Sequence, residues 1–348
     1  MRPPFRLGIP VLAGLFATAA PALEFALPTQ GDTVVGEAFV VTPTPDNTLF
    51  DLARYFDTGA LDITLSNPRL DPWVPGADQR VIIPTEYILP PKPWRGIVVN
   101  IPQRRLFYFP PKTARRPATV ITFPVSIARE GWSTPLGTTR VIGKYKDPAW
   151  IVPRSIKAEH EAGGEPFPDY FPPGVDNPMG MLAIQTGFRG IFIHGTNKPW
   201  GLGLRQSHGC LHLYPEDAVQ LFGQVAAGLP VRIENHPLVV GIRHGGVVMA
   251  RYPGVSEYPA APVGLDALRA LIAALPPRAG LPEELDWARA KTLLGSGSAL
   301  PVPLAVGSPL PARRLADAPA RPYTHPPYGS DANQASPPVR PGSAAGTD

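Results

Sequence analysis

Apolar residues between positions 94 and 234 fall in short blocks separated by glycine and proline, a spacing typical of strands. The predicted strands cover residues 96–101, 105–109, 119–125, 138–144, 190–194 and 230–233. Residues 215–227 instead have the features of a helix, because Pro215 stands at an early position and two acids follow in the first turn. The pattern predicts a mainly β domain at 94–234 that carries one helix.

A smaller unit is predicted before this domain, over residues 39–84. The polar cluster at 46–48 is typical of a helix N-terminus, and apolar residues at 49–56 follow it at helical spacing. A second short helix, a turn at Asn67-Pro68 and an apolar strand at 81–84 complete the unit. The pattern therefore predicts a small α/β module.

Two segments follow the β domain. Residues 235–299 are predicted to form a C-terminal appendix with a strand at 246–252 and helices at 265–275 and 282–294. Residues 300–348 are rich in proline, alanine, glycine and serine, and they offer little apolar surface to offset the entropy lost on ordering. This tail is predicted to be disordered.

The first residues have the features of a secretory leader. Arg2 and Arg6 accompany an apolar stretch at 7–20, and Ala20-Pro21-Ala22 has small residues at the two positions that a signal peptidase reads. We predict a cleavable signal peptide at 1–22, with an uncleaved membrane anchor as the alternative.

Composition narrows the possible partners. The net charge is only +4, and lysine and arginine form no dense cluster, so the chain lacks the basic patch of a nucleic-acid-binding protein. The 48 prolines favour many short strands over long helices.

The chain has one cysteine, Cys210, in the run Ser207-His208-Gly209-Cys210. Oxidising compartments favour paired cysteines or none, so a lone thiol in an exported chain points to chemistry. His208 and Cys210 would face the same side of an extended stretch, where an imidazole can take the proton of a thiol. Gly209 permits unusual backbone angles, and N–H groups around it would suit an oxyanion. A buried structural cysteine is the alternative.

A zinc site is a further alternative for the same residues. His194, His208, Cys210 and His212 are all of types that bind zinc. Three of them would lie on one short extended run at 208–212, which is an uncommon spacing for zinc ligands. We therefore expect no metal.

Taken together, these residues resemble the L,D-transpeptidase family with the YkuD-type catalytic domain. The resemblance covers residues 94–234 and rests on the stretches 131–139 and 194–199 and on the Ser-His-Gly-Cys run. It implies a β-sandwich catalytic domain. The module at 39–84 resembles a LysM carbohydrate-binding module, so the expected fold is mainly β with an α/β LysM-like N-terminal module and a helical appendix.

The resemblance implies a reaction on peptidoglycan in the periplasm. Cys210 would attack the carbonyl between meso-diaminopimelate and D-alanine of a tetrapeptide stem, releasing D-alanine and leaving a thioester. His208 would be the base, oriented by the backbone carbonyl of Ser207, and no metal or organic cofactor is implied. The acceptor would be another stem, a lipoprotein or an outer-membrane protein. Water as acceptor would make the chain a carboxypeptidase or amidase, and a catalytically silent wall-binding scaffold is the alternative from another class.

Five further residues are expected near the substrate. His194, Gly195 and Thr196 belong to the family motif, and Arg205 lies on the loop that enters the catalytic run, where it would bind substrate or only be solvated. His212 stands where many relatives carry arginine. If it binds carboxylates of the stem, it must be protonated, so with an ordinary pKa of about 6.5 the affinity would weaken from about pH 6 to 8. A plain surface residue is the alternative.

Overall fold

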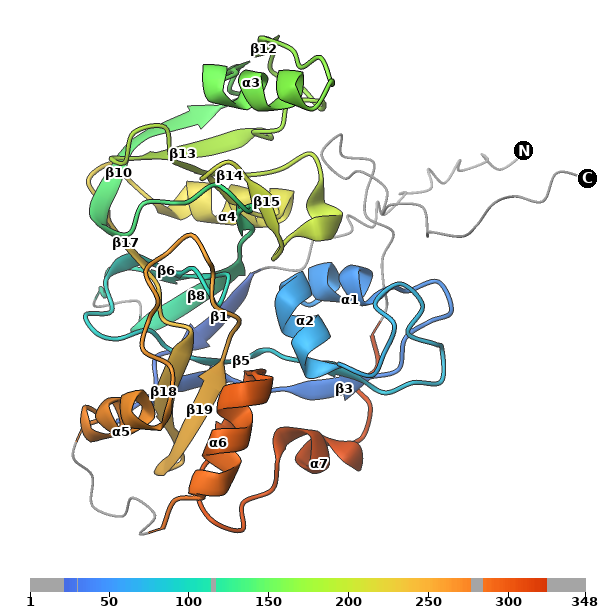
Figure 1. Ribbon diagram of the computed structural model, residues 1–348, viewed down its shortest axis with the longest axis vertical. Helices are drawn as coiled ribbons and strands as arrows, with labels where there is room; N and C mark the ends of the chain where they lie inside the picture. Colours follow the sequence, from blue (N-terminus) through green and yellow to red (C-terminus); the bar gives the residue numbers. More distant parts are fainter. Residues whose placement is uncertain (1–21, 30, 114–116, 277–283, 324–348) are drawn as a thin grey trace, which may run out of the picture.

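The computed structural model describes residues 22–29, 31–113, 117–276 and 284–323. A nine-stranded sheet curls through the middle of the molecule (Figure 1). In spatial order its strands are β1 (Leu23–Ala26), β8 (Thr119–Pro124), β7 (Arg105–Phe109), β6 (Gly96–Asn100), β17 (Pro230–Glu234), β10 (Gly137–Lys146), β13 (Leu182–Thr186), β14 (Phe192–His194) and β16 (Leu211–His212). Only the pairs β6–β17 and β14–β16 of this sheet are parallel. The mainly β fold predicted from the sequence is confirmed.

Strands β6, β7 and β8 are buried along their whole length because both faces of the sheet are covered. Val98 and Phe107 contribute to one hydrophobic cluster. Their neighbours Ile97 and Leu106 contribute to the opposite cluster, which also contains Leu221 of α4 (Pro215–Gln224). This alternation is the period of two of a strand, and burial on both faces explains why the apolar blocks are continuous.

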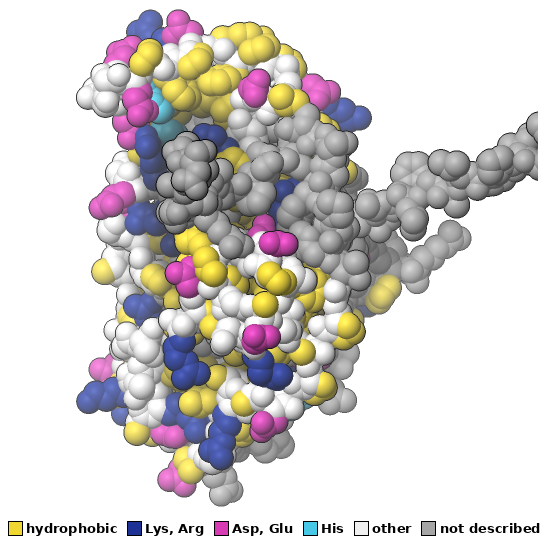
Figure 2. Space-filling view, turned by 90° about the vertical axis from the view of Figure 1, so that its right-hand side faces the viewer, with side chains coloured by type: hydrophobic (Ala, Val, Ile, Leu, Met, Phe, Trp, Pro, Cys, Tyr) yellow, Lys and Arg dark blue, Asp and Glu magenta, His cyan; other side chains and the backbone are white. Residues whose placement is uncertain are grey.

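Between β10 and β13 the chain leaves the sheet and forms an insertion, residues 147–181, at the top of Figure 1. The insertion contains β11 (Trp150–Ile151), α3 (Arg154–Ala162) and β12 (Tyr170–Phe171). The amide of Asn177 fastens it by donating hydrogen bonds to three backbone carbonyls. Hydrophobic side chains gather at this end of the molecule in Figure 2, and those exposed on the insertion include Ile151, Tyr170, Val175 and Met181.

Residues 39–84 form a β–α–α–β unit. It consists of β3 (Phe39–Val41), α1 (Leu49–Tyr55), α2 (Ala60–Ser66) and β4 (Val81–Ile83), with β3 antiparallel to β4, and the pair β2 (Val34–Gly36) and β5 (Glu86–Ile88) flanks it. Thr48 caps α1 in a capping box with Asp51. The buried side chain of Asn67 bonds Ile63 and both backbone groups of Ile82, and so joins α2 to β4. The two helices and last strand lie where the sequence predicts them, whereas β3 was missed.

The segment after residue 234 builds a second, three-stranded sheet. Its elements are β18 (Leu238–Arg243), β19 (Gly246–Arg251), α5 (Leu265–Ala273), α6 (Trp287–Ser296), β20 (Ser298–Pro303) and α7 (Pro311–Ala316). Among the described residues, no helix of the chain has the length and apolar character needed to cross a bilayer.

The disorder predicted for residues 300–348 is wrong for residues 300–323. Strand β20 pairs with β19, and the side chains of Leu300, Val302 and Leu304 are buried. Tyr323 packs on the β–α–α–β unit, where its hydroxyl donates to Asn47 at 2.6 Å. The average composition of the tail hides this short apolar run, which is stable because β19 offers an edge to pair with. The rest of the tail, and leader residues 1–21, lie outside the described residues.

Buried charges join the β–α–α–β unit to the catalytic sheet. The guanidinium of Arg105, on β7, is fully buried and lies 3.2 Å from Asp62 of α2 and 3.9 Å from the centre of the Tyr87 ring. Arg54 of α1 makes two hydrogen bonds, of 2.8 and 2.9 Å, with Glu216 of α4. Because the partners come from different units, these ion pairs fix the orientation of the unit against the sheet.

The order of the tail can be tested with one buried and one exposed residue. Leu304 is fully buried, whereas Val306 is 57% exposed. Leu304→Ala should lower the free energy of unfolding by about 2–5 kcal/mol, because it leaves a cavity in the C-terminal core. Val306→Ala is the matched control and should change it by less than about 0.5 kcal/mol. Denaturant unfolding measures both; equal, negligible effects would mean that this segment is not folded in solution.

Candidate active site

Cys210 lies in a tight turn between β15 (Arg205–Ser207) and β16. The hydroxyl of Ser207 donates to the carbonyl of Cys210 at 2.6 Å and accepts from the N–H of Gly209 at 3.2 Å, so it holds both ends of the turn. Gly209 has a φ of +121°, and a Cβ there would lie 3.1 Å from the carbonyl oxygen of Ser133 and from Ile191. Only glycine fits this position without strain.

The thiol of Cys210 is partly exposed and lies beside the start of β14. The backbone N–H of Phe192 points at Sγ, with a separation of 3.4 Å, and Sγ lies 3.6 Å from the carbonyl oxygen of Gly190. Loss of water around the sulfur raises the pKa of Cys210 to about 11, although the Phe192 N–H partly offsets this. The thiol is therefore protonated at neutral pH and needs a base to become a nucleophile.

The parallel pairing of β14 with β16 places two histidines on the side of the thiol. His194 is in register with His212, and Ile193 with Leu211, so Cys210 follows as the position opposite Phe192. Side chains alternate along strands, so His194, His212 and Cys210 face one side of the sheet. The two imidazole rings lie 4.6 Å apart.

His194 is buried and held in one tautomer. Its Nδ1 lies 2.6 Å from the carbonyl oxygen of Gly195. Because a carbonyl only accepts, Nδ1 carries the proton and the lone pair of the neutral ring is on Nε2. Burial lowers the pKa of His194 to about 4, with hydrogen bonds to the carbonyls of Gly195 and Met179 opposing the shift. The ring is therefore neutral at pH 7 and can accept a proton through Nε2.

His208 has a different environment from the one predicted. Its Nε2 lies 2.7 Å from the guanidinium of Arg129 and 3.3 Å from Glu159 Oε2, and its ring packs edge-on against Trp132. Because a guanidinium only donates, neutral His208 accepts through Nε2 and carries its proton on Nδ1. Burial first, and then the charge of Arg129, lower the pKa of this ring.

The predicted orienting contact from Ser207 to His208 is also replaced. The carbonyl of Ser207 accepts a hydrogen bond of 2.8 Å from the backbone N–H of Arg129. A backbone carbonyl does accept from an imidazole here, but the carbonyl belongs to Gly195 and the imidazole to His194. The turn at Gly209 interrupts the extended run that was expected to align His208 with Cys210.

His212 does not have the ordinary pKa on which its predicted pH response depends. Burial, and the neighbouring rings of His194 and His208, hold its pKa well below the usual value. Its Nδ1 has no hydrogen-bond partner among the described residues. Both features disfavour the protonated form that was expected to bind carboxylates of a substrate.

Arg205 is occupied by a partner that the sequence did not reveal. Its guanidinium lies 2.6 Å from Glu257, in the loop after β19, and its Nε donates to the carbonyl of Ala128. The hydrogen bond from Arg205 lowers the pKa of Glu257 to about 2. The hydroxyl of Thr196 accepts a hydrogen bond of 3.0 Å from the N–H of Lys198.

The C-terminal segment also supports the catalytic turn. The hydroxyl of Tyr258 accepts from the N–H of Thr134 at 2.8 Å and donates to the carbonyl of the same residue at 3.0 Å. Thr134 in turn donates through Oγ1 to the carbonyl of Gly209 at 2.7 Å. Tyr258 is 124 positions from Thr134, and no local pattern could indicate this contact.

Over the described part of the chain, no group of three histidine, cysteine, aspartate or glutamate residues is placed to hold a metal ion.

Known proteins share this catalytic segment. Residues 95–233 match the family of the L,D-transpeptidase catalytic domain, YkuD. The chain is 38% identical over 226 residues to the probable L,D-transpeptidase YbiS of Escherichia coli strain K12, covering 64% of this chain and 72% of that protein. It is 37% identical over 235 residues to the probable L,D-transpeptidase YcfS of the same strain, covering 66% and 72%. The crystal structure of L,D-transpeptidase 3 from Mycobacterium tuberculosis matches with 21% identity over 60% of this chain and 97% of that chain, with a TM-score of 0.29.

The protonation state of Cys210 can be tested by alkylation with iodoacetamide. With the pKa raised to about 11, the reactive thiolate is scarce at neutral pH, and the rate should keep rising as pH increases toward that value. At pH 8 alkylation should be on the order of 100-fold slower than that of a small thiol with a pKa of about 8.5. Mass spectrometry measures the rate, and Cys210→Ser gives the background. A fast rate that is level from pH 6 to 8 would instead indicate a preformed thiolate–imidazolium pair.

Proposed function

This chain belongs to the L,D-transpeptidase family with a YkuD-type catalytic domain, and we propose that it remodels peptidoglycan through a thioester on Cys210. The observation that carries the proposal is the register of β14 with β16, which places the lone thiol of Cys210 and the buried imidazole of His194 on the same face of the sheet. Burial favours the neutral form of both groups, and a neutral acid and a neutral base on one face suit nucleophilic attack with proton transfer in the same step.

In the proposed reaction, Sγ of Cys210 attacks the carbonyl carbon between meso-diaminopimelate and the terminal D-alanine of a tetrapeptide stem. The thiol proton moves to Nε2 of His194, and it then passes to the nitrogen of D-alanine as the C–N bond breaks. An acceptor amine attacks the thioester carbonyl and loses a proton to His194; the C–S bond then breaks, the sulfur of Cys210 takes that proton back, and the stem is joined to the acceptor by a new amide. His194 acts as base and acid, and the carbonyl of Gly195 stabilises the imidazolium formed in between.

Two observations support His194 over His208 as the base. The tautomer of His194 leaves Nε2 with a lone pair, whereas Nε2 of His208 already accepts from Arg129. Moreover, His194 lies on the strand that pairs with the catalytic segment, whereas the turn at Gly209 separates His208 from Cys210. His208 is then a positioning residue that links the catalytic turn to Arg129 and Trp132.

The cellular setting and the remaining units are part of the same proposal. The leader predicted at 1–22 would carry the protein to the periplasm, where stem peptides are available. The β–α–α–β unit at 39–84 would hold the enzyme on the glycan as a LysM-like module, fixed to the catalytic domain by the Arg54–Glu216 and Arg105–Asp62 pairs. The acceptor would be a second stem, a lipoprotein or an outer-membrane protein.

The roles of the two histidines can be separated with purified tetrapeptide muropeptides and mass spectrometry. Cys210→Ala should abolish D-alanine release, and His194→Ala should lower kcat by about 10²–10⁴-fold, as expected for loss of a general base. His208→Ala should retain more activity than His194→Ala. A carbapenem should add once per chain, at Cys210, and more slowly in His194→Ala.

Other outcomes would point to the alternatives. Loss of acylation in His208→Ala but not in His194→Ala would return the role of base to His208. Products that are only hydrolysed would identify a carboxypeptidase. No product and no carbapenem adduct, with Cys210 still open to alkylation, would identify a silent scaffold.

A further inference from the structure

Three polar side chains beside the catalytic turn converge on a single carboxylate oxygen, Oε2 of Glu159. Arg129 forms an ion pair with it, Trp132 Nε1 donates to it at 3.1 Å, and His208 Nε2 lies 3.3 Å away. Lost hydration raises the pKa of Glu159, but the hydrogen bond and charge of Arg129, the charge of His208 when that ring is protonated, and the hydrogen bond from Trp132 outweigh it and lower the pKa overall. The group is therefore a carboxylate at neutral pH, and it occupies an anion site formed by Arg129, Trp132 and His208.

The carboxylate and its partners come from different parts of the fold. Arg129 and Trp132 lie on the loop that the sheet holds against the catalytic turn, and His208 is two residues from Cys210. Glu159 belongs to α3 of the insertion at residues 147–181, outside the sheet. The insertion has its own internal ion pair between Lys157 and Asp169. This pair does not include Glu159, so displacement of Glu159 from the anion site would not itself break it.

The site is also open to an external anion. The side chains of Arg129 and Glu159 are 34% and 40% exposed, and that of His208 is 20% exposed. A guanidinium beside an indole N–H is a suitable carboxylate receptor, because arginine binds both oxygens in a fixed fork, and the imidazole adds a further donor when it is protonated. Arg205, a further cation near the catalytic turn, is paired with Glu257.

We propose that Arg129, Trp132 and His208 form the binding site for a free carboxylate of the donor stem, and that Glu159 occupies this site until the stem displaces it. The inference rests on the proposed function, since a tetrapeptide stem has free carboxylates at its terminal D-alanine and on the second centre of meso-diaminopimelate. Both would be recognised by the same chemistry. Glu159 then acts as an internal competitor that lowers the affinity for the substrate.

The test measures binding of a tetrapeptide stem to a Cys210→Ala protein by calorimetry, which requires no turnover. Glu159→Gln should tighten binding by about tenfold, because a charged competitor is removed, and Arg129→Lys should weaken it by about tenfold because the fork is lost. Asp169→Asn is the matched control, since it removes a carboxylate of the insertion outside the anion site and should leave the affinity unchanged.

Amidated stems identify the carboxylate. A stem amidated at D-alanine and one amidated on meso-diaminopimelate should be compared with the free acid, and the form that binds weakly and no longer responds to Glu159→Gln carries the recognised group. Equal affinities for all three forms, or weaker binding in Glu159→Gln, would overturn the proposal. Carboxylate-dependent binding without any thioester or product would instead contradict only the proposed function.

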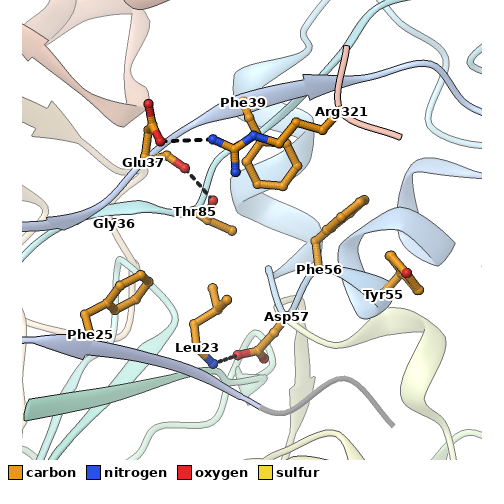
Figure 3. Close-up of a pocket in the computed structure, with 10 residues that line it drawn as sticks. All are labelled: Leu23, Phe25, Gly36, Glu37, Phe39, Tyr55, Phe56, Asp57, Thr85 and Arg321. Atoms are coloured by element: carbon orange, nitrogen blue, oxygen red, sulfur yellow. Dashed lines mark hydrogen bonds and ion pairs between the residues drawn. The ribbon is translucent and has the colours of Figure 1, made fainter. Parts of the chain in front are cut away.

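A second inference rests on the buried carboxyl groups at the start of β1. Asp57, in the loop between α1 and α2, is 3% exposed, and its Oδ2 accepts a hydrogen bond of 2.9 Å from the backbone nitrogen of Leu23 (Figure 3). Its Oδ1, like Oδ2 of the buried Asp217, has no hydrogen-bond partner among the described residues. Leu23 and Asp57 line a cavity of about 440 Å³, and Phe25, Phe39 and Phe56 supply much of its wall.

Asp57 and Asp217 form a buried pair of carboxyl groups. Arg54 pairs with Glu216 and Arg105 with Asp62, and within the described part of the chain no ion pair joins Asp57 or Asp217 to a cation. Burial raises the pKa of both carboxyl groups, the charge of Arg105 opposes the shift only in part, and a hydrogen bond links the two side chains. A cation beside Asp57 would stabilise the carboxylate form of this pair.

The geometry points to the α-ammonium of Leu23 as that cation, formed when the leader is removed. Hydrolysis of the Ala22–Leu23 peptide bond consumes one water, leaves a carboxylate on Ala22 and turns the nitrogen beside Asp57 into an ammonium group. Pairing of Leu23 with Thr122 of β8 holds this nitrogen in place. Since Asp217 lies in the first turn of α4, three residues after Tyr214 and close behind the catalytic strand, leader removal would stabilise the helix that supports the active site.

Chains that differ only at the first residue test this second proposal. A chain that starts at Leu23 should melt several degrees higher than the same chain with one added glycine, which moves the ammonium away. Asp57→Asn should lower the melting temperature of the first chain and change the second much less, while Asp266→Asn, at a fully exposed carboxylate, should affect neither.

The amine itself gives a second readout. In the folded chain that starts at Leu23, acetylation of the α-amine should be slower than in the free peptide Leu-Glu-Phe-Ala, and its pKa should lie above the ordinary value of about 8. Equal melting temperatures for the two chains together with peptide-like acetylation would overturn the proposal.

Discussion

The parallel hydrogen bonding of β14 with β16 determines where Cys210 and His194 lie. Strand β16 has only two residues, and it is held on its other side by two hydrogen bonds between His212 and Ser126, of 3.1 and 3.2 Å. A slip of one residue would turn Cys210 to the opposite face of the sheet, away from His194. The hydroxyl of Ser207 and the close approach of Gly209 to Ser133 prevent such a slip, so the small residues of the motif act on register rather than on the substrate.

A neutral centre and a charged periphery follow from this arrangement. The thiol and the imidazole of His194 are both uncharged at pH 7, because burial disfavours the thiolate and the imidazolium alike. The charges nearby are paired, Arg129 with Glu159 and Arg205 with Glu257. In the proposed reaction, the thiolate and the imidazolium would therefore form only once a bound substrate has excluded water. Fixed hydrogen-bond donors have their greatest effect in such a site.

The sequence predicted the parts of the structure that depend on local patterns. The continuous apolar blocks predicted the buried strands β6, β7 and β8, because residues such as Val98 and Ile97 must be covered on both faces. Cys210 pointed to the segment that is proposed to react, because the single cysteine of the chain stands two residues after a histidine. The cap at Thr48 and the turn at Asn67 predicted the limits of two helices, since both residues bond their own neighbourhood.

The features that the sequence could not predict depend on contacts between distant residues. From the sequence alone, His194 and His208 are equally plausible as the proposed base. Only the register of β14 with β16 shows that His194 lies on the same face of the sheet as Cys210. Glu159 and Tyr258 lie in segments without any motif, and β20 becomes a strand only because β19 presents an edge to Leu300 and Val302. The low pKa of His212 is likewise a result of burial among other rings, which no single position reveals.

The contacts of Glu257 and Tyr258 have a consequence for how such proteins diversify. A boundary drawn at residue 234 separates the catalytic domain by sequence family, but the groups that hold Arg205 and Thr134 lie beyond it. Recombination at that point would exchange a C-terminal unit together with two supports of the catalytic turn. Lineages that shuffle their accessory domains should therefore inherit the segment through residue 258 with the enzyme and vary only the residues after it.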